Sequence, residues 1–121
     1  MNISVLILTR DEEPNLAGCL ESVRWCDDVV VLDSFSTDRT VDIANQYGAR
    51  VVLRRVDDYA RQRNHGLCEV DYRNPWLLIL DADERVPEDL RREMEVAVRD
   101  AEPETCLFRM RRRDFLFGRW I

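Results

Sequence analysis

The chain has 121 residues, a net charge of −6 and 45% hydrophobic residues, which fits one globular domain over residues 1–121. The negative charge argues against a general nucleic-acid-binding protein, and no apolar stretch is long enough to cross a bilayer. All the basic residues are arginines, so chemistry that needs a lysine, such as a Schiff base or a Walker-type phosphate site, is excluded.

Short apolar runs alternate with amphipathic segments along the chain. The apolar runs predict strands over residues 3–8, 29–32, 51–53 and 76–80. The helical patterns after them predict helices over about residues 14–24, 38–47, 58–69 and 87–100. Four strand–helix alternations predict an α/β fold with a parallel sheet and right-handed crossovers. A fifth strand is expected over residues 106–112.

Polar residues before two of these helices are candidates for N-caps. Ser36 or Thr37 is expected to cap the second helix, and Asp57 or Asp58 the third. Each would accept hydrogen bonds from backbone N–H groups that the first helical turn leaves unpaired.

The run over residues 76–80 stops at two carboxylates one residue apart, Asp81 and Asp83. A continuous apolar run predicts a strand buried on both faces, and two hard oxygen ligands at its end suit Mg²⁺ or Mn²⁺. The alternative is that the acids only precede the next helix, which begins near Pro87. A short D-x-D motif does not by itself decide between the two.

Polar residues also follow the first and second predicted strands, in the segments 9–12 and 33–38. The carboxyl ends of parallel strands lie at one edge of the sheet, where such folds bind ligands. These segments and residues 81–83 are therefore expected to converge on an acidic pocket that a metal ion or another cation would occupy.

The cysteines and the single histidine do not predict a metal or nucleophile site. Cys19, Cys26, Cys68 and Cys106 have no C-x-x-C spacing, and we expect them to be reduced, packed thiols. A Ser-His-Asp triad would have to use His65, which lies in a helical pattern without a nucleophile elbow.

Residues 108–121 are rich in arginine and aromatic side chains. They fit an edge strand with solvated arginines, a peripheral contact with an anionic membrane, or the broken end of a longer protein. We favour truncation, and we expect the exposed apolar residues of 108–121 to cause self-association. Since no signal-type segment is present, the expected location is cytoplasmic, with any membrane contact peripheral at the cytoplasmic face of the inner membrane.

Four segments together resemble family 2 glycosyltransferases of GT-A fold, over the N-terminal half that binds the nucleotide-sugar. Residues 5–13 (V-L-I-L-T-R-D-E-E) look like the opening strand and turn of that family, and residues 30–40 look like its V-V-D-D-x-S-x-D-x-T segment. Residues 60–67 are similar to its Asn-bearing helix, and residues 80–83 match its D-x-D element. Residues 108–121 look like the subgroup that adds glucose or a related sugar to lipopolysaccharide core.

The resemblance implies a Rossmann-like, mainly parallel sheet flanked by helices. The implied activity is metal-dependent transfer of a sugar from a nucleoside diphosphate donor, expected to be a UDP-sugar, to a glycan or lipid-linked acceptor in cell-envelope polysaccharide biosynthesis. The implied cofactor is Mn²⁺ or Mg²⁺, with Asp81 and Asp83 as metal ligands. The residues implied in nucleotide-sugar binding are Thr9, Arg10, Glu12, Asp33, Arg61 and Asp81.

Within that set, the resemblance places Thr9, Glu12 and Asp33 at the uridine. Asp11 stands where the family usually has Asn, and Ser34 where it usually has the second Asp of a pair, which leaves the base identity open. The family's acceptor site and general base lie beyond its D-x-D half. We therefore assign no catalytic residue here, and we expect this chain alone to bind a nucleotide without transferring sugar.

Three other functions fit parts of the sequence. A D-x-D phosphatase usually has Thr or Val two residues after the second Asp, but Arg85 stands there and the strand is the fourth, not the first. A phospho-acceptor receiver domain needs a lysine after its last strand, and this chain contains no lysine. A non-catalytic nucleotide-sugar-binding module remains the principal alternative.

Overall fold

A computed structural model describes residues 2–55, 58–107, 115–116 and 119–120. Its main sheet has four parallel strands, as the sequence predicts, and the structure places them in the order β3-β2-β1-β4. These strands are β1 (Ile3–Thr9), β2 (Val29–Asp33), β3 (Arg50–Leu53) and β4 (Trp76–Asp81).

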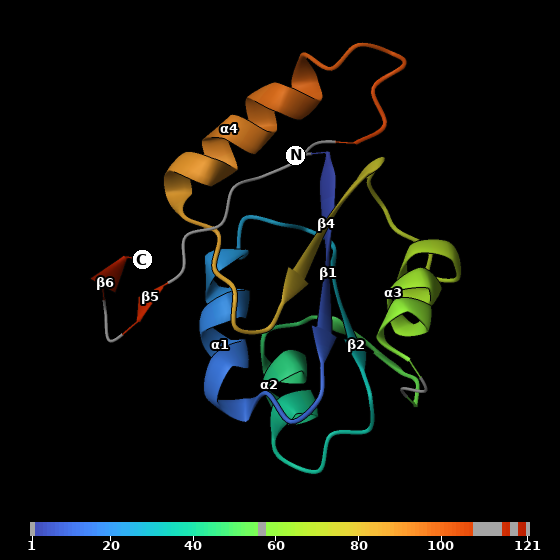
Figure 1. The fold of residues 1–121 in the computed structure, drawn as a ribbon, viewed down its shortest axis with the longest axis vertical. Coiled ribbons are helices and arrows are strands. Elements are labelled where there is room, and N and C mark those ends of the chain that lie inside the picture. Colours follow the sequence, from blue (N-terminus) through green and yellow to red (C-terminus); the bar gives the residue numbers. More distant parts are fainter. Residues whose placement is uncertain (1, 56–57, 108–114, 117–118, 121) are drawn as a thin grey trace.

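Helices cover both faces of this sheet (Figure 1). They are α1 (Glu13–Ser22), α2 (Thr40–Gln46), α3 (Tyr59–Cys68) and α4 (Glu88–Arg99). The chain moves from β1 to β3 in one direction and then returns across the sheet to β4, so right-handed crossovers place α3 on the face opposite α1 and α2. Residues of α1, α2 and α4 share one apolar layer, whereas Leu6, Leu8, Val30 and Leu32 face the other layer.

Strand β1 is the fully buried strand, because β2 and β4 pair with its two edges. Strand β4 ends the order of the described sheet, and its Leu77 and Ile79 are only half-buried. The expectation that residues 76–80 form a strand buried on both faces is therefore wrong. Asp81 is the last residue of β4, and Asp83 lies in the following turn. The strand therefore does not extend from Asp81 to Asp83.

The predicted N-cap is found at α3 but not at α2. Asp58 caps α3, and its carboxylate accepts hydrogen bonds from the backbone N–H groups of Ala60 and Arg61 at 2.8 and 3.4 Å. Helix α2 has no side-chain N-cap, so the prediction that Ser36 or Thr37 caps it is wrong. Both hydroxyl residues instead bind carboxylates in the loops described below.

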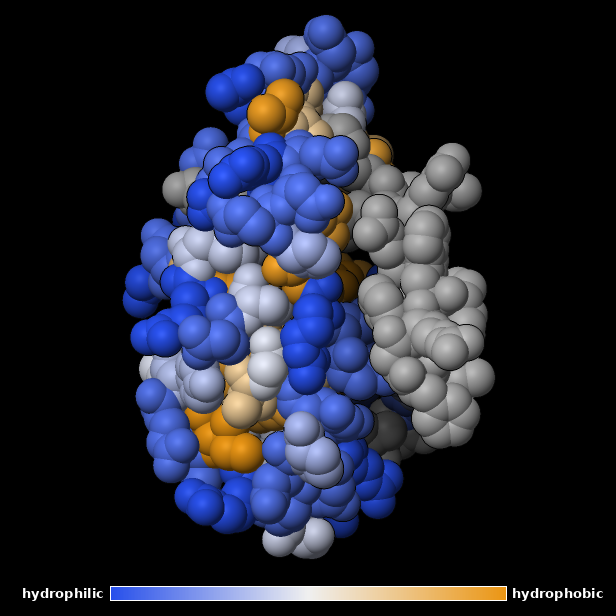
Figure 2. Space-filling view, turned by 90° about the vertical axis from the view of Figure 1, so that its left-hand side faces the viewer, coloured by the Kyte–Doolittle hydropathy of each residue, from blue (hydrophilic) through white to orange (hydrophobic). Residues whose placement is uncertain are grey.

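The predicted strand over residues 106–112 is not found at Cys106 and Leu107, and the rest of it lies outside the described residues. Two short strands, β5 (Phe115–Leu116) and β6 (Arg119–Trp120), pair antiparallel as a separate sheet. The self-association and membrane contact expected of residues 108–121 rest mainly on residues outside the described ranges. Among the described helices, none has the length and apolarity to span a membrane. Figure 2 shows a mainly hydrophilic face with its apolar residues in separate patches.

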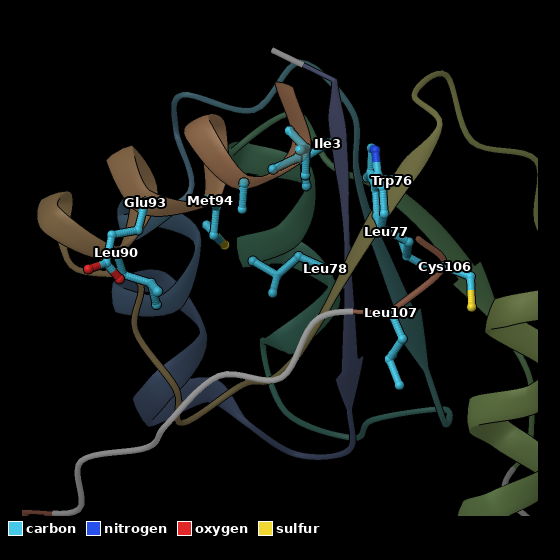
Figure 3. Close-up of a pocket in the computed structure, with 11 residues that line it drawn as sticks. Ile3, Trp76, Leu77, Leu78, Leu90, Glu93, Met94, Cys106 and Leu107 are labelled. Atoms are coloured by element: carbon cyan, nitrogen blue, oxygen red, sulfur yellow. The ribbon is translucent and has the colours of Figure 1, made fainter. Parts of the chain in front are cut away.

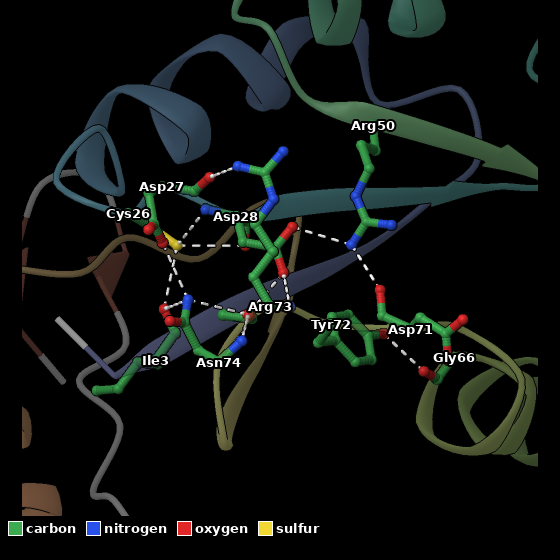
Figure 4. Close-up of polar contacts among 11 residues, drawn as sticks. Ile3, Cys26, Asp27, Asp28, Arg50, Gly66, Asp71, Tyr72, Arg73 and Asn74 are labelled. Atoms are coloured by element: carbon green, nitrogen blue, oxygen red, sulfur yellow. Dashed lines mark hydrogen bonds and ion pairs between the residues drawn. The ribbon is translucent and has the colours of Figure 1, made fainter.

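A buried carboxylate ties the amino ends of β1 and β4 to β3 (Figure 4). Asp28 accepts hydrogen bonds from Ser4 Oγ at 2.7 Å, from the Arg73 backbone N–H at 2.7 Å and from Arg50 Nη2 at 2.9 Å. Asn74 completes the cluster by donating to Ser4 Oγ at 3.2 Å. This network lies at the sheet edge opposite the polar loops that follow β1, β2 and β4.

The four cysteines are free, but only some of them are packed. Cys19 is buried, and burial raises the pKa of its thiol to about 12. Burial also raises the pKa of the half-buried Cys26. Cys68 and Cys106 are exposed, so the expectation of packed thiols is wrong for these two.

This difference predicts two classes of thiol in the folded protein. Because the thiolate is the reactive form, Cys68 and Cys106 should react with Ellman's reagent at pH 8, while Cys19 should not. We expect two rapidly reacting thiols in native protein and four after denaturation in urea. Rapid labelling of Cys19 in the folded chain, located by mass spectrometry, would contradict this packing.

Candidate functional site

The polar loops after β1, β2 and β4 meet at one edge of the sheet, as the sequence predicts (Figure 1). Thr9 at the end of β1 lies opposite Asp33 at the end of β2, and Leu8 lies opposite Asp81 at the end of β4. The strand order reverses between β1 and β4, which is the switch point where open α/β sheets bind ligands.

The Asp33 carboxylate is fully buried and forms the floor of this edge. It accepts hydrogen bonds from Thr9 Oγ1 at 2.6 Å, from Ser36 Oγ at 2.6 Å and from the Ser36 backbone N–H at 2.8 Å. The Thr9 side chain is also buried. In this conformation, Thr9 and Asp33 bind each other and hold the loop in place.

The loops after β1 and β2 are joined by further hydrogen bonds. The Asp11 N–H donates to Ser36 Oγ at 2.8 Å, and the Thr37 N–H donates to Asp11 Oδ1 at 2.7 Å. The Glu12 N–H donates to Thr40 Oγ1 at 2.9 Å. Asp11 has a φ of +50°, which Asp and Asn tolerate better than most residues, so Asp is compatible with a position where the resemblance expects Asn.

Phe35 is a residue of this edge that the sequence analysis did not single out. Its φ is +50°, an unusual conformation for a bulky residue, and 50% of its surface is exposed. The Arg55 guanidinium carbon lies 5.4 Å from the centroid of the Phe35 ring. Strained, exposed residues cluster at functional sites, and this one lies beside the buried Asp33.

The carboxyl end of β4 is closed by Tyr59 and Glu84. The Tyr59 hydroxyl donates to Asp81 Oδ1 at 3.1 Å, and partial burial together with the Asp81 charge raises the pKa of Tyr59. The Asp81 N–H donates to Glu84 Oε1 at 2.8 Å, and the Glu84 N–H donates to the Asp81 carbonyl at 2.9 Å. Asp83 projects from this turn as an exposed residue.

Asp81 and Asp83 supply only oxygen donors, which suit a hard divalent cation. Among the described residues, no group of three carboxylate, histidine or cysteine side chains lies close enough to hold a metal ion. Mg²⁺ sites often combine one or two carboxylates with phosphate oxygens of the substrate. The donor set therefore fits a divalent ion bound jointly with a phosphorylated ligand.

The other predicted site residues, Arg10, Glu12 and Arg61, lie on the segments that follow β1 and begin α3. Arg10 is exposed, and Glu12 Oε2 accepts a hydrogen bond from Asn15 Nδ2 at 3.1 Å. Arg61 is exposed on the first turn of α3, the same turn that carries Tyr59 to Asp81.

An apolar cavity of about 230 Å³ lies elsewhere, between α4 and the amino-terminal parts of β1 and β4 (Figure 3). Ile3, Trp76 and Met94 line it, and Glu93 is the one charged residue among the described residues of its lining. It is separate from the polar edge, and its lining, as far as the structure describes the chain, contains no arginine that could bind a phosphorylated ligand.

Comparison with known proteins identifies relatives over most of the chain. The family model described as Glycosyl transferase family 2 matches residues 4–120. An uncharacterised glycosyltransferase of Rickettsia felis is 40% identical over 77% of this chain and 32% of its own length. The lipopolysaccharide core biosynthesis glycosyltransferase LpsC of Rhizobium meliloti is 32% identical over 96% of this chain and 44% of its own length. The chain thus spans about a third of the length of the first of these relatives.

Solved structures share the fold. The S. aureus TarS fragment 1–349 superposes with a TM-score of 0.70 at 22% identity, over 83% of this chain and 33% of that one. The mannosyltransferase PcManGT of Pyrobaculum calidifontis, solved with GDP-Man and Mn²⁺, has a TM-score of 0.69 at 24% identity, over 89% and 36%. The predicted Rossmann-like α/β fold of GT-A type is confirmed.

Proposed function

This chain belongs to glycosyl transferase family 2, and from that membership we propose that residues 1–121 form the donor-binding part of an enzyme that transfers a sugar from a nucleoside diphosphate sugar. The observation that carries the proposal is the alignment of Thr9, Asp33 and Asp81 at one end of three adjacent strands. That edge combines a buried, hydrogen-bonded polar floor with the carboxylates of Asp81 and Asp83 at the switch point of the sheet.

We assign the two ends of the site to the two parts of the ligand. The nucleoside lies over the loops after β1 and β2, where Thr9, Arg10, Glu12 and Asp33 are gathered, and Arg61 approaches from α3. The diphosphate lies at the end of β4 beside Asp81 and Asp83. Buried, hydrogen-bonded groups suit an uncharged base, whereas exposed carboxylates suit a metal ion that carries phosphate.

The proposed cofactor is Mn²⁺ or Mg²⁺, held by Asp83 and Asp81. The bound ion would neutralise the charge that develops on the leaving diphosphate. The Tyr59 hydroxyl fixes one Asp81 oxygen, so that carboxylate is oriented by the protein before any ligand binds.

The acceptor hydroxyl must lose a proton during transfer, and we assign no general base among the described residues. Glu84 follows the carboxylates, but its Oε1 accepts the Asp81 N–H and braces the turn. We propose a glycan or lipid-linked saccharide of the cell envelope as the acceptor, because the relative LpsC is named for lipopolysaccharide core biosynthesis. A peripheral position at the membrane would suit such an acceptor.

Calorimetric titration of UDP and GDP, in Mn²⁺ and in EDTA, tests the proposal. Both are included because related folds were solved with UDP-GlcNAc and with GDP-Man. We expect one of them to bind more tightly in Mn²⁺ than in EDTA. If neither nucleotide binds, or if binding is indifferent to the metal, the proposed site is wrong.

Asp33→Asn keeps the shape of this buried side chain but replaces one acceptor oxygen with a donor. Hydrogen bonds to a charged group contribute roughly 1.5–3 kcal/mol, so weakening those that Asp33 accepts from Thr9 and Ser36 should loosen the loops proposed to hold the nucleoside. We expect the affinity for the free nucleoside to fall about tenfold or more. The affinity for the nucleoside diphosphate should fall by the same factor.

The control for this variant is Asp42→Asn, which changes an exposed carboxylate on α2 and should leave binding unaltered. A loss confined to diphosphate ligands would instead place Asp33 with the metal ligands.

A further inference from the structure

One side chain, Arg85, joins the turn after β4 to helix α1. Its Nη1 donates to the carbonyl oxygens of Ala82 at 3.2 Å and Glu84 at 2.9 Å. Its Nη2 donates to the Asn15 carbonyl oxygen at 3.0 Å. Figure 1 shows the connection from β4 to α4 running beside α1. A single guanidinium thus holds the backbone on both sides of Asp83 against one helix.

Gly18 makes this arrangement possible. A Cβ atom at position 18 would lie 2.6 Å from Arg85 Nη2, 2.7 Å from Nε and 2.8 Å from Cζ. Any side chain there would push the guanidinium away from α1. Glycine weakens the interior of a helix relative to alanine, so its presence within α1 has a packing reason in this contact.

The start of helix α1 is also bound to the loop after β2 and to the first residue of α2. The Glu12 N–H donates to Thr40 Oγ1 at 2.9 Å, and the Glu13 N–H donates to Asp38 Oδ2 at 3.1 Å. In return, the Arg39 N–H donates to Glu13 Oε1 at 2.9 Å. The start of α1 is therefore fixed to the nucleoside end of the proposed site, and Arg85 fixes the same helix to the turn that carries Asp83.

We propose that Arg85, seated on Gly18, is a positioning residue that sets the place of the D-x-D turn relative to the nucleoside loops. The inference rests on the proposed function, because the turn so placed is the one proposed to hold the metal ion and the diphosphate. The planar guanidinium reaches three carbonyl oxygens in fixed directions, which a lysine ammonium cannot reproduce with the same geometry.

Hydrogen exchange tests the positioning without any ligand. The Glu84 N–H donates to the Asp81 carbonyl within this turn, so its exchange rate reports how well the turn is closed. In Arg85→Gln and in Gly18→Ala we expect this amide to exchange about tenfold faster, while amides of β1 keep their wild-type rates. Arg92→Gln, which changes an exposed arginine of α4, is the matched control. Unchanged protection of Glu84 in both variants overturns the proposal.

Binding provides the second readout. In Gly18→Ala, which leaves every charge in place, we expect the Mn²⁺-dependent gain in UDP or GDP affinity to fall about tenfold, with affinity in EDTA unchanged. The double variant with Arg85→Gln should bind as Arg85→Gln does alone, and Arg85→Lys should not restore the gain. If the losses of affinity in the two single variants multiply in the double variant, the proposal is overturned. An affinity loss of the same size in EDTA also overturns it, because Arg85 would then act on the ligand without the metal, as by direct contact with phosphate. If wild-type protein shows no gain with Mn²⁺, the proposed function fails, and the exchange of Glu84 still decides whether Arg85 positions the turn.

Discussion

Asp83→Ala is expected to remove the Mn²⁺-dependent part of nucleoside diphosphate binding. Asp83 is an exposed carboxylate in the turn after β4, and Asp81, its partner in the motif, is already oriented by Tyr59. Loss of groups that merely orient metal ligands costs 10–100-fold in metal affinity, so loss of a ligand should cost about 100-fold or more. Calorimetric titration in Mn²⁺ and in EDTA measures the change.

The matched control is Asp89→Ala, which removes an exposed carboxylate from the first turn of α4 and should leave binding intact. Affinity of Asp83→Ala in Mn²⁺ should equal that of wild-type protein in EDTA. If the variant keeps the full gain with Mn²⁺, Asp83 is not a metal ligand, and the acids after β4 only precede the next helix.

The second large effect is expected at the opposite edge of the sheet, where Asp28→Ala should destabilise the fold. Asp28 is buried and accepts hydrogen bonds from Ser4, Arg50 and the Arg73 N–H. Its removal leaves these donors without the carboxylate, and a hydrogen bond to a charged group contributes about 1.5–3 kcal/mol. We expect the free energy of unfolding in urea to fall by about 3 kcal/mol, with Asp42→Ala as the exposed control.

The same carboxylate predicts how stability depends on pH. Burial acts to raise the pKa of Asp28, but the hydrogen bonds from the Arg73 N–H, Ser4 and Arg50 outweigh it and lower the pKa below the ordinary value of 3.8. The stabilisation is then fully present above pH 3.8 and is lost as the pH falls through the lower, folded-state pKa. Wild-type protein should lose more stability than Asp28→Ala over that interval. Equal losses would mean that the Asp28 charge does not stabilise the folded chain.

The fold could be predicted because its signals are local. Apolar runs end at polar residues four times, and the alternation of strands with helices leaves few arrangements other than a parallel sheet. An apolar run does not distinguish a central strand from an edge strand, however, because both bury apolar side chains. Residues 76–80 were therefore predicted to be more buried than they are, and the interior positions of the described sheet belong to β1 and β2.

The site could be predicted in part. Asp33 and Asp81 follow apolar runs directly and Asp83 comes two residues later, so their place at the sheet edge follows from the chain order. The contacts of Tyr59 and Arg85 join residues 22 and 70 positions apart, and such pairs depend on how elements pack. The hydrogen bond between Thr9 and Asp33 depends on strand register, which the sequence pattern left open. Gly18 inside a helical pattern is a signal of close packing against α1 that the sequence-based prediction did not use.

Paramagnetic broadening by Mn²⁺ in NMR spectra of isotope-labelled protein tests the central claim most directly, because it locates the ion. With UDP or GDP present, we predict that trace Mn²⁺ broadens the amide signals of residues 81–84 most strongly. The loops after β1 and β2 should be affected less, and the cluster around Asp28 not at all. Broadening centred on Asp28 or Glu93, or no localised broadening with either nucleotide, would contradict a metal-dependent donor site at the end of β4.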